Sequence, residues 1–206
     1  MEVIFLGFFT GLSLILAIGP QNIFVIEQGL KKQHVFLVCI ICSFSDCFLI
    51  FLGIFLFNYF NQFFNSTIEF ILNIALILFL INFIYSKFKN FNKEINLKTK
   101  KNETTYGILL KTLGFTFLNP HVYSDTVFIL GNFSKNYLLK EKIIFGIGAS
   151  IASFLFFFLI GYLSNFFSKY AQNRKIWKII NLFIITFMSF LTFLFELLGA
   201  QVRIHH

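Results

Sequence analysis

The chain alternates between long apolar stretches and short polar connections. Each stretch runs for roughly 20 residues or more, the length that an α-helix needs to cross the hydrocarbon core of a bilayer. Most of the stretches are apolar nearly all round, as expected of helices whose outer face meets lipid. The pattern predicts an all-α integral membrane protein with six transmembrane helices, at about residues 3–26, 35–59, 67–88, 108–131, 142–167 and 177–200.

The longest polar segment, at about 87–107, divides the six predicted helices into two blocks of three. Because each block has an odd number of spans, the second block enters the membrane from the opposite side. The two blocks then form an inverted repeat, an arrangement common in secondary transporters. We therefore expect one membrane domain over residues 1–206, with a first repeat at about 1–88, the basic loop, and a second repeat at about 108–200.

The only two prolines, Pro20 and Pro120, stand inside the first and fourth apolar stretches. A proline inside a helix removes a backbone hydrogen bond and costs about 3 kcal/mol. In lipid the freed carbonyl groups need another partner. We expect helices 1 and 4 to be broken at these two residues. Breaks at matching places in two halves of a membrane protein are the best sequence indication of a transporter's binding site.

Only two of the nine acidic residues lie well within a predicted span: Asp46 in the second and Asp125 in the fourth. A charged aspartate at a helix centre costs at least ~2.5 kcal/mol on insertion scales, so it normally faces the bundle interior or a water-filled cavity. Both are candidate counter-ions for a cationic substrate, or proton carriers. The alternative is that they satisfy freed backbone groups or a polar neighbour.

In the fourth stretch, the turn that follows the break carries several polar groups. His121 lies four residues before Asp125, so both project from one helix face, one turn apart. Asn119 and Pro120 begin the same turn. This patch offers hydrogen-bond donors, acceptors and freed carbonyls, although His121 is equally well explained as a packed histidine with one hydrogen bond.

In the first stretch, Gln21 and Asn22 follow Pro20 and bring amide groups to a similar depth. They either cap the carbonyls freed by the proline or bind a substrate. An α-amino acid needs N–H donors for its carboxylate, such as those at the N-terminus of a broken helix. Its ammonium needs carbonyls or a carboxylate, and a cationic side chain needs a second carboxylate. Two intramembrane aspartates and two broken helices meet these needs.

The composition supports a membrane protein. Apolar residues make up 57% of the chain, with 34 phenylalanines and a mean hydropathy of +0.80, outside the range of soluble proteins. The net charge of +8 comes from loops, chiefly those after helices 1, 3 and 5. Since cytoplasmic loops carry the lysine and arginine excess, we expect these three loops to be cytoplasmic and both termini outside. The charge therefore gives no reason to expect a nucleic-acid partner.

Other classes of function have less support. The sequence lacks the Gly-x-Ser-x-Gly and His-Glu-x-x-His motifs of hydrolases and zinc proteases, and nothing in it calls for a cofactor. The cysteines Cys39, Cys42 and Cys47 share one helix, which favours packing over a disulfide or a resident metal site. A divalent-metal exporter is an alternative in which the two aspartates, the histidine and a cysteine supply mixed ligands. A structural membrane protein would leave the broken helices and buried acids unexplained.

Several short motifs carry a resemblance that spans nearly the whole chain. The most specific is Asn-Pro-His-x-Tyr-x-Asp at 119–125, within a longer matching run at 117–126. The other matching positions are Gly-Pro-Gln-Asn at 19–22, Gln-Gly at 28–29, Ser-Asp at 45–46, Gly131, and Ile-Ile-Asn-Leu at 179–182. At these residues the chain resembles the LysE family of basic amino acid exporters, most closely its arginine-exporting branch.

The resemblance implies a small exporter of L-arginine or L-lysine in the bacterial cytoplasmic (inner) membrane, driven by the proton gradient. It implies a role for Asp46 and Asp125, because both positions match the family, and we expect that role to be substrate binding and proton coupling. The membrane potential opposes export of a cation by ~2.3 kcal/mol per charge per 100 mV. Exchange of each exported cation for one inward proton would remove this cost. The expected partners are a basic amino acid, protons and the lipid bilayer, with monomer and homodimer both open. An exporter of neutral amino acids, of the threonine or homoserine type, is the nearest alternative.

Overall fold

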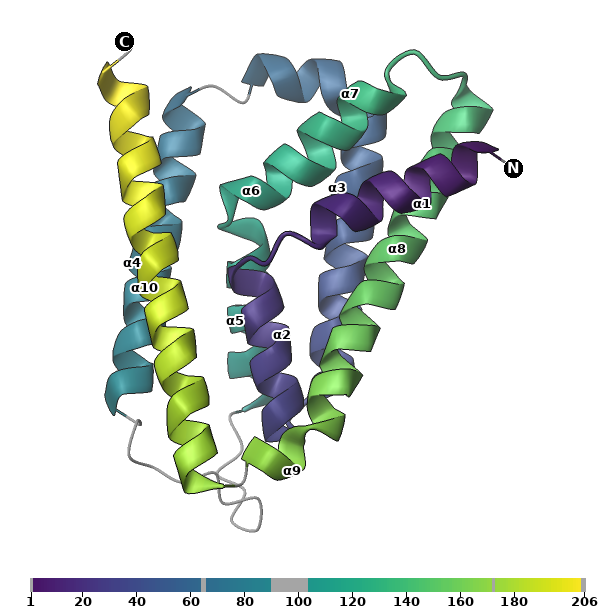
Figure 1. The fold of residues 1–206 in the computed structure, drawn as a ribbon. Helices are drawn as coiled ribbons and strands as arrows, with labels where there is room; N and C mark the ends of the chain where they lie inside the picture. Colours follow the sequence, from purple (N-terminus) through teal and green to yellow (C-terminus); the bar gives the residue numbers. More distant parts are fainter. Residues whose placement is uncertain (1, 64–65, 90–103, 172, 205–206) are drawn as a thin grey trace.

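The computed structural model describes residues 2–63, 66–89, 104–171 and 173–204. Throughout these segments the chain forms helices joined by short connections, and no β-strand occurs in them (Figure 1). The all-α prediction is therefore confirmed. Backbone groups in lipid can be satisfied within a single segment only by a helix, which explains why long apolar stretches fold in this way.

Four long helices coincide with predicted spans. They are α3 (Val35–Phe63), α4 (Ser66–Lys89), α8 (Leu139–Phe166) and α10 (Arg174–Ile204). Among the described residues, two helical stretches are long and apolar enough to cross a membrane, Val35–Phe57 and Leu139–Phe166, and Phe70–Ser86 is a shorter apolar helix. The full count of six spans stays a prediction.

The first predicted span is divided into α1 (Glu2–Ile15) and α2 (Pro20–Lys31), which are bent by 82° relative to each other. Taken together, this pair is long and apolar enough to form a third span. Pro20 stands at the start of α2. The first N–H groups of any helix lack an intrahelical partner, so a proline there removes nothing. Pro20 thus begins a new helix instead of kinking a continuous one.

The fourth predicted span is divided in a similar way. Its parts are α5 (Thr105–Phe117), α6 (Pro120–Tyr123), η1 (Ser124–Ile129) and α7 (Leu130–Ser134). Pro120 begins α6 after the N-cap residue Asn119, so the breaks expected at both prolines are present. The η1 segment is a π-helical turn, a rare form that occurs frequently at functional sites.

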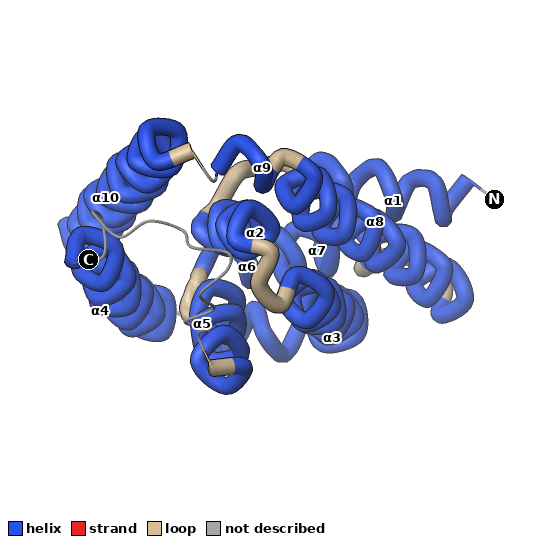
Figure 2. The backbone as a smooth tube through the Cα atoms, turned by 90° about the horizontal axis from the view of Figure 1, so that it is seen from below, coloured by secondary structure: helices blue, strands red, loops and turns tan. Residues whose placement is uncertain are grey.

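The two broken helices meet in the middle of the bundle. Figures 1 and 2 show α2 and α5 at the centre, with α3 and α8 on one side and the α4–α10 pair on the other. From the breaks, α1 and the α6–η1–α7 segment both run toward the upper end of the molecule in Figure 1. The short helix α9 (Ser168–Ala171) packs against α2 at the lower end.

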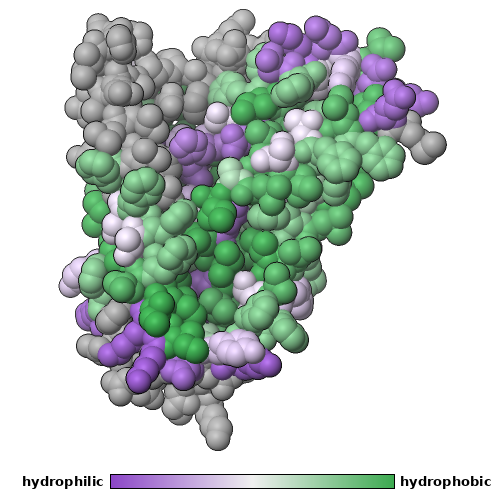
Figure 3. All heavy atoms as spheres, in the orientation of Figure 1, coloured by the Kyte–Doolittle hydropathy of each residue, from purple (hydrophilic) through white to green (hydrophobic). Residues whose placement is uncertain are grey.

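The surface has the distribution of polarity that a bilayer requires. In Figure 3 apolar side chains cover the middle of the molecule, and polar ones gather at its lower end and upper right corner. Phe44 and Phe48 of α3, for example, are each 60% exposed. Most of the predicted basic loop at 87–107 lies outside the described residues, and the sidedness of loops and termini stays a prediction.

Candidate functional site

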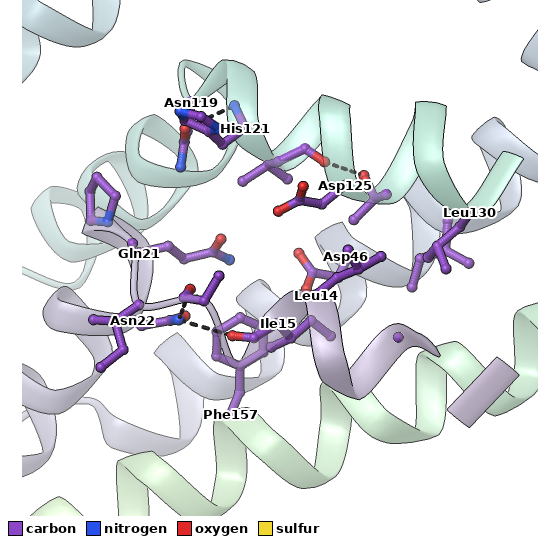
Figure 4. A pocket seen from close by; sticks show the side chains of 18 residues that line it. Leu14, Ile15, Gln21, Asn22, Asp46, Asn119, His121, Asp125, Leu130 and Phe157 are labelled. Atoms are coloured by element: carbon purple, nitrogen blue, oxygen red, sulfur yellow. Dashed lines mark hydrogen bonds between the residues drawn. The ribbon is translucent and has the colours of Figure 1, made fainter. Parts of the chain in front are cut away.

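A cavity of about 240 Å³ lies where the two helix breaks meet (Figure 4). The end of α1, the connection at 16–19 and the start of α2 form one side, and α3, α6 and η1 contribute most of the rest. Six lining residues are the candidate binding residues of the sequence analysis: Gln21, Asn22, Asp46, Asn119, His121 and Asp125. The structure brings all six together. Pro20 also lines the cavity, whereas Pro120 is buried beside it.

Asp46 is the midpoint of the apolar stretch Val35–Phe57 and is only 3% exposed. Its Oδ2 atom accepts a hydrogen bond of 3.0 Å from the Ser153 hydroxyl of α8. No residue in the described part of the chain hydrogen-bonds its Oδ1 atom. One carboxylate oxygen is therefore oriented by the protein, and the other is available to a ligand in the cavity.

Asp125 lies on η1, and its half-buried carboxylate faces Asp46 across the cavity (Figure 4). No lysine or arginine occurs among the described residues that line this space. Two carboxylates that face each other in a low-dielectric site repel, and a cation between them removes that repulsion. The cavity is therefore built to accept positive charge.

Close backbone packing places the two aspartates opposite each other. Gly53 follows Asp46 by two turns on the same face of α3. A Cβ atom at Gly53 would stand 2.5 Å from the Cα atom of Val127 in η1, and one at Gly131 would stand 2.8 Å from the carbonyl oxygen of Gly53. Only glycine allows this approach, so α3 and η1 touch backbone to backbone.

The two amides after Pro20 have different roles. The Asn22 Nδ2 group donates hydrogen bonds to the carbonyl oxygens of Ile15 at 3.2 Å and Ala17 at 3.1 Å. Asn22 thus caps the carbonyls left at the end of α1, one of the two roles expected for it. Gln21 points its amide toward Asp46 (Figure 4), and its Nε2 atom has no hydrogen-bond partner within the described segments. Gln21 is the amide that a ligand can use.

Helix starts at the two breaks supply further polar groups. Asn119 caps α6 by accepting a hydrogen bond of 3.1 Å from the backbone N–H of His121, whose side chain is exposed at the edge of the cavity. Gly19, the N-cap of α2, has no side chain to accept from the first N–H groups of that helix. Such N–H groups and the positive end of the helix dipole form a ready anion site.

Residues 12–199 match the family model described as LysE type translocator. The chain belongs to the LysE family. Two LysE-type relatives are similar over most of their length. The arginine exporter protein ArgO of Pectobacterium atrosepticum is 31% identical over 182 residues, which cover 86% of this chain and 88% of that protein. ArgO of Klebsiella pneumoniae is 30% identical over 195 residues, which cover 92% and 90%. No solved structure matches the chain.

Membership of the LysE family identifies the chain as a membrane transporter rather than an enzyme. The resemblance to this family that the sequence motifs indicated is confirmed. All six candidate residues fall within the matched segment, and so do both helix breaks. Within the described residues, no group of three or more histidine, cysteine, aspartate or glutamate side chains is arranged to hold a metal ion.

Several contributors to the site of this LysE family protein were not singled out by the sequence. Ser153 orients Asp46, Phe157 lines the cavity from α8, and Thr126 lines it from η1. Ser153 is one small polar residue in an apolar helix, and no local pattern singles it out. Gly53 could have been predicted from the sequence. A glycine two turns from an intramembrane aspartate indicates that another helix packs closely on the face that carries the aspartate.

The hydrogen bonds of Asn22 lead to a prediction about stability. Replacing Asn22 with leucine would leave two carbonyl groups at the end of α1 without their donor. We expect Asn22→Leu to destabilise the protein by about 1–3 kcal/mol, the usual cost of leaving a buried polar group unsatisfied. The melting temperature in detergent measures this. The exposed Asn132 of α7 provides the matched control, because Asn132→Leu makes the same change away from the break. Equal melting of the two variants would contradict the capping role.

Proposed function

We propose that this LysE family member exports L-arginine, L-lysine or both across the bacterial cytoplasmic membrane in exchange for protons. The acidic cavity carries the proposal: two facing carboxylates line it, and its described lining residues include no lysine or arginine. A neutral amino acid would leave these carboxylates uncompensated, whereas a cationic side chain pairs with them. The relatives named arginine exporters support the same substrate class.

The cavity offers a separate contact for each end of a basic amino acid. The start of α2, where Gly19 leaves the first N–H groups uncapped, suits the α-carboxylate. The open Oδ1 atom of Asp46 and the carboxylate of Asp125 suit the guanidinium or ammonium group. The volume of about 240 Å³ is below the roughly 300–1,000 Å³ of drug-sized sites, in keeping with one small metabolite.

Proton coupling follows from the same two carboxylates. A cation leaving the cell works against ~2.3 kcal/mol per 100 mV of inside-negative potential. If a proton and the basic side chain compete for one carboxylate, a proton taken up outside is released when substrate binds from inside. Each cycle then exchanges one cation for one proton. The potential no longer opposes export, and the pH gradient drives it.

Alternating access through two inverted blocks is the transport motion that we propose. Corresponding helices of the two blocks pack against each other: α2 contacts α5, α3 contacts α8, and α4 contacts α10. This pairing is what a two-fold relation between the blocks would produce. Rocking of one block against the other would open the cavity first to one side of the membrane and then to the other.

The proposal predicts efflux of basic amino acids from cells that lack their own exporters. Cells that make this protein should lose preloaded radiolabelled arginine or lysine faster than cells with an empty vector. A protonophore should abolish the difference. Loss of threonine alone would instead assign the protein to neutral amino acid export. Efflux of none of the three, from cells with correctly inserted protein, would overturn the proposal.

A further inference from the structure

One face of α2 stays polar beyond the cavity. Gln28 follows Gln21 by seven residues, which is two helical turns and about 10 Å along the same face. Gln28 is 1% exposed, and neither its Nε2 nor its Oε1 atom has a hydrogen-bond partner among the residues that the structure describes. A buried amide with neither atom bonded is destabilising. Another conformation of the protein, in which these two atoms find partners, would offset that cost.

An aromatic cluster separates the two glutamines. Phe24 lies between them on the same face of α2 and is 1% exposed. Its ring centroid is 4.9 Å from that of Phe115 in α5 and 6.3 Å from that of Phe83 in α4. Phe83 and Phe115 are in turn 5.1 Å apart. These three residues, which we call the aromatic plug, pack together between α2, α4 and α5, at a level along α2 between Gln21 and Gln28.

The surroundings of α2 indicate which side of the helix can open. A Cβ atom at Gly29 would stand 2.5 Å from the carbonyl oxygen of Gly161, so this side of α2 packs directly on the backbone of α8. The plug residues lie on the other side, toward α4 and α5. There the α4–α10 pair packs mainly on itself and stands to one side of the bundle (Figures 1 and 2). Separation of that pair from α2 would withdraw Phe83 from the plug without disturbing the contact with α8. Parting Phe24 from Phe115 also requires α5 to move away from α2.

The end of this polar face comes to the surface of the protein. Lys31 forms an ion pair with the buried Glu27 and is itself partly exposed. This end of α2 lies beside α9 at the lower end of Figure 1. The loop that follows α2 is one of those that the lysine and arginine distribution predicts to be cytoplasmic. A path along this face would therefore join the cytoplasm, Gln28, the plug and the cavity, in that order.

We infer that Gln28 forms an inner contact site for the transported amino acid, and that the aromatic plug parts to pass the substrate from Gln28 to the cavity. The inference rests on the proposed export function. An amide offers two donors and one acceptor, so it can bind both the carboxylate and the ammonium group of an amino acid. In the open state its atoms gain water or substrate as partners, which they lack while the plug is closed.

Thiol labelling tests whether the face of Gln28 opens to the cytoplasm. Inside-out membrane vesicles containing the Gln28→Cys variant would be treated with a membrane-impermeant maleimide, with the wild-type protein as background for the three native cysteines. Ile23→Cys is the matched control, because Ile23 is also buried, at 4% exposure, but lies on the opposite face of α2. We expect labelling at Gln28→Cys several-fold above the control. Equal labelling of the two variants would overturn the inference.

Transport measurements test the contact with substrate. Gln28→Leu should slow arginine efflux about tenfold through loss of a hydrogen bond to a charged group, while the melting temperature stays level or rises because an unsatisfied buried amide has been removed. Gln33→Leu, the same change just beyond α2, should leave efflux unchanged. Normal efflux by Gln28→Leu, or a lower melting temperature, would contradict the inference. If the wild-type protein exports no amino acid, the proposed function fails, whereas the labelling experiment still reports whether the path opens.

Discussion

Asp46→Asn and Asp125→Asn should each abolish arginine efflux, with a loss of about 100-fold or more. Each substitution keeps the size of the side chain and removes one of the two charges that face the cavity. The guanidinium group of bound arginine would then be buried with only one carboxylate to balance its charge. Removing one partner of a buried ion pair typically costs about 3–5 kcal/mol. If Asp46 and Asp125 also carry the exchanged proton, as proposed, the loss should persist at high internal arginine.

Efflux of radiolabelled arginine at matched protein levels measures this effect. Glu2→Gln is the control, because Glu2 is an exposed acid at the start of α1 that lies far from the cavity lining. Ser153→Ala adds a graded test. It keeps the charge of Asp46 but removes the hydrogen bond that orients Oδ2, so it should reduce efflux less than Asp46→Asn does. Normal arginine efflux by both Asp46→Asn and Asp125→Asn would show that the two carboxylates have no role in transport.

Gly53→Val should both destabilise the protein and strongly reduce arginine efflux. The added side chain would begin 2.5 Å from the Cα atom of Val127 and 2.8 Å from the carbonyl oxygen of Thr126, and backbone atoms cannot turn aside as a flexible side chain can. Overpacking of this kind costs at least about 1–3 kcal/mol. Any fold that survives must move η1 away from α3, which would separate Asp125 from Asp46. We expect efflux to fall more than tenfold even where protein is recovered, since misplacing a reacting group by about 1 Å can cost 100-fold.

Size-exclusion profiles, melting temperature and efflux should be recorded together for this variant. Gly107→Ala serves as the control, because a Cβ atom at Gly107 would meet only the hydroxyl oxygen of Thr104, at 3.1 Å. That variant should retain efflux. Wild-type melting and efflux by Gly53→Val would show that the close contact between α3 and η1 is not needed to hold the two aspartates in place.

The LysE resemblance and the acidic cavity point to the same class of substrate from independent observations. The family model matches residues 12–199, nearly the whole chain. The acidic character of the cavity is a separate observation, because it depends only on which side chains line that space. Gln21, Asn119 and His121 lie in the matching motifs and also line the cavity. Gln28 also stands in one of the matching motifs, yet it does not line the cavity and lies two turns further along α2.

By itself, the sequence determined the helices, their breaks and the identity of the polar groups between them. Apolar stretches of spanning length have only the helix available in lipid. The two prolines could only begin a helix or break one. Acids at the centre of such stretches are so costly that Asp46 and Asp125 stood out without any structure.

Only the tertiary structure decided which of these groups face one another and which serve the fold. Asn22 and Gln21 are neighbours with the same functional group, yet one caps α1 and the other points to Asp46. The partner of Asp46 is 107 residues away in the sequence, at Ser153. The periodicity of a sequence shows which residues share one face of a helix. These contacts depend instead on how different helices cross and on the close packing of α3 against η1 at Gly53, neither of which a local pattern contains.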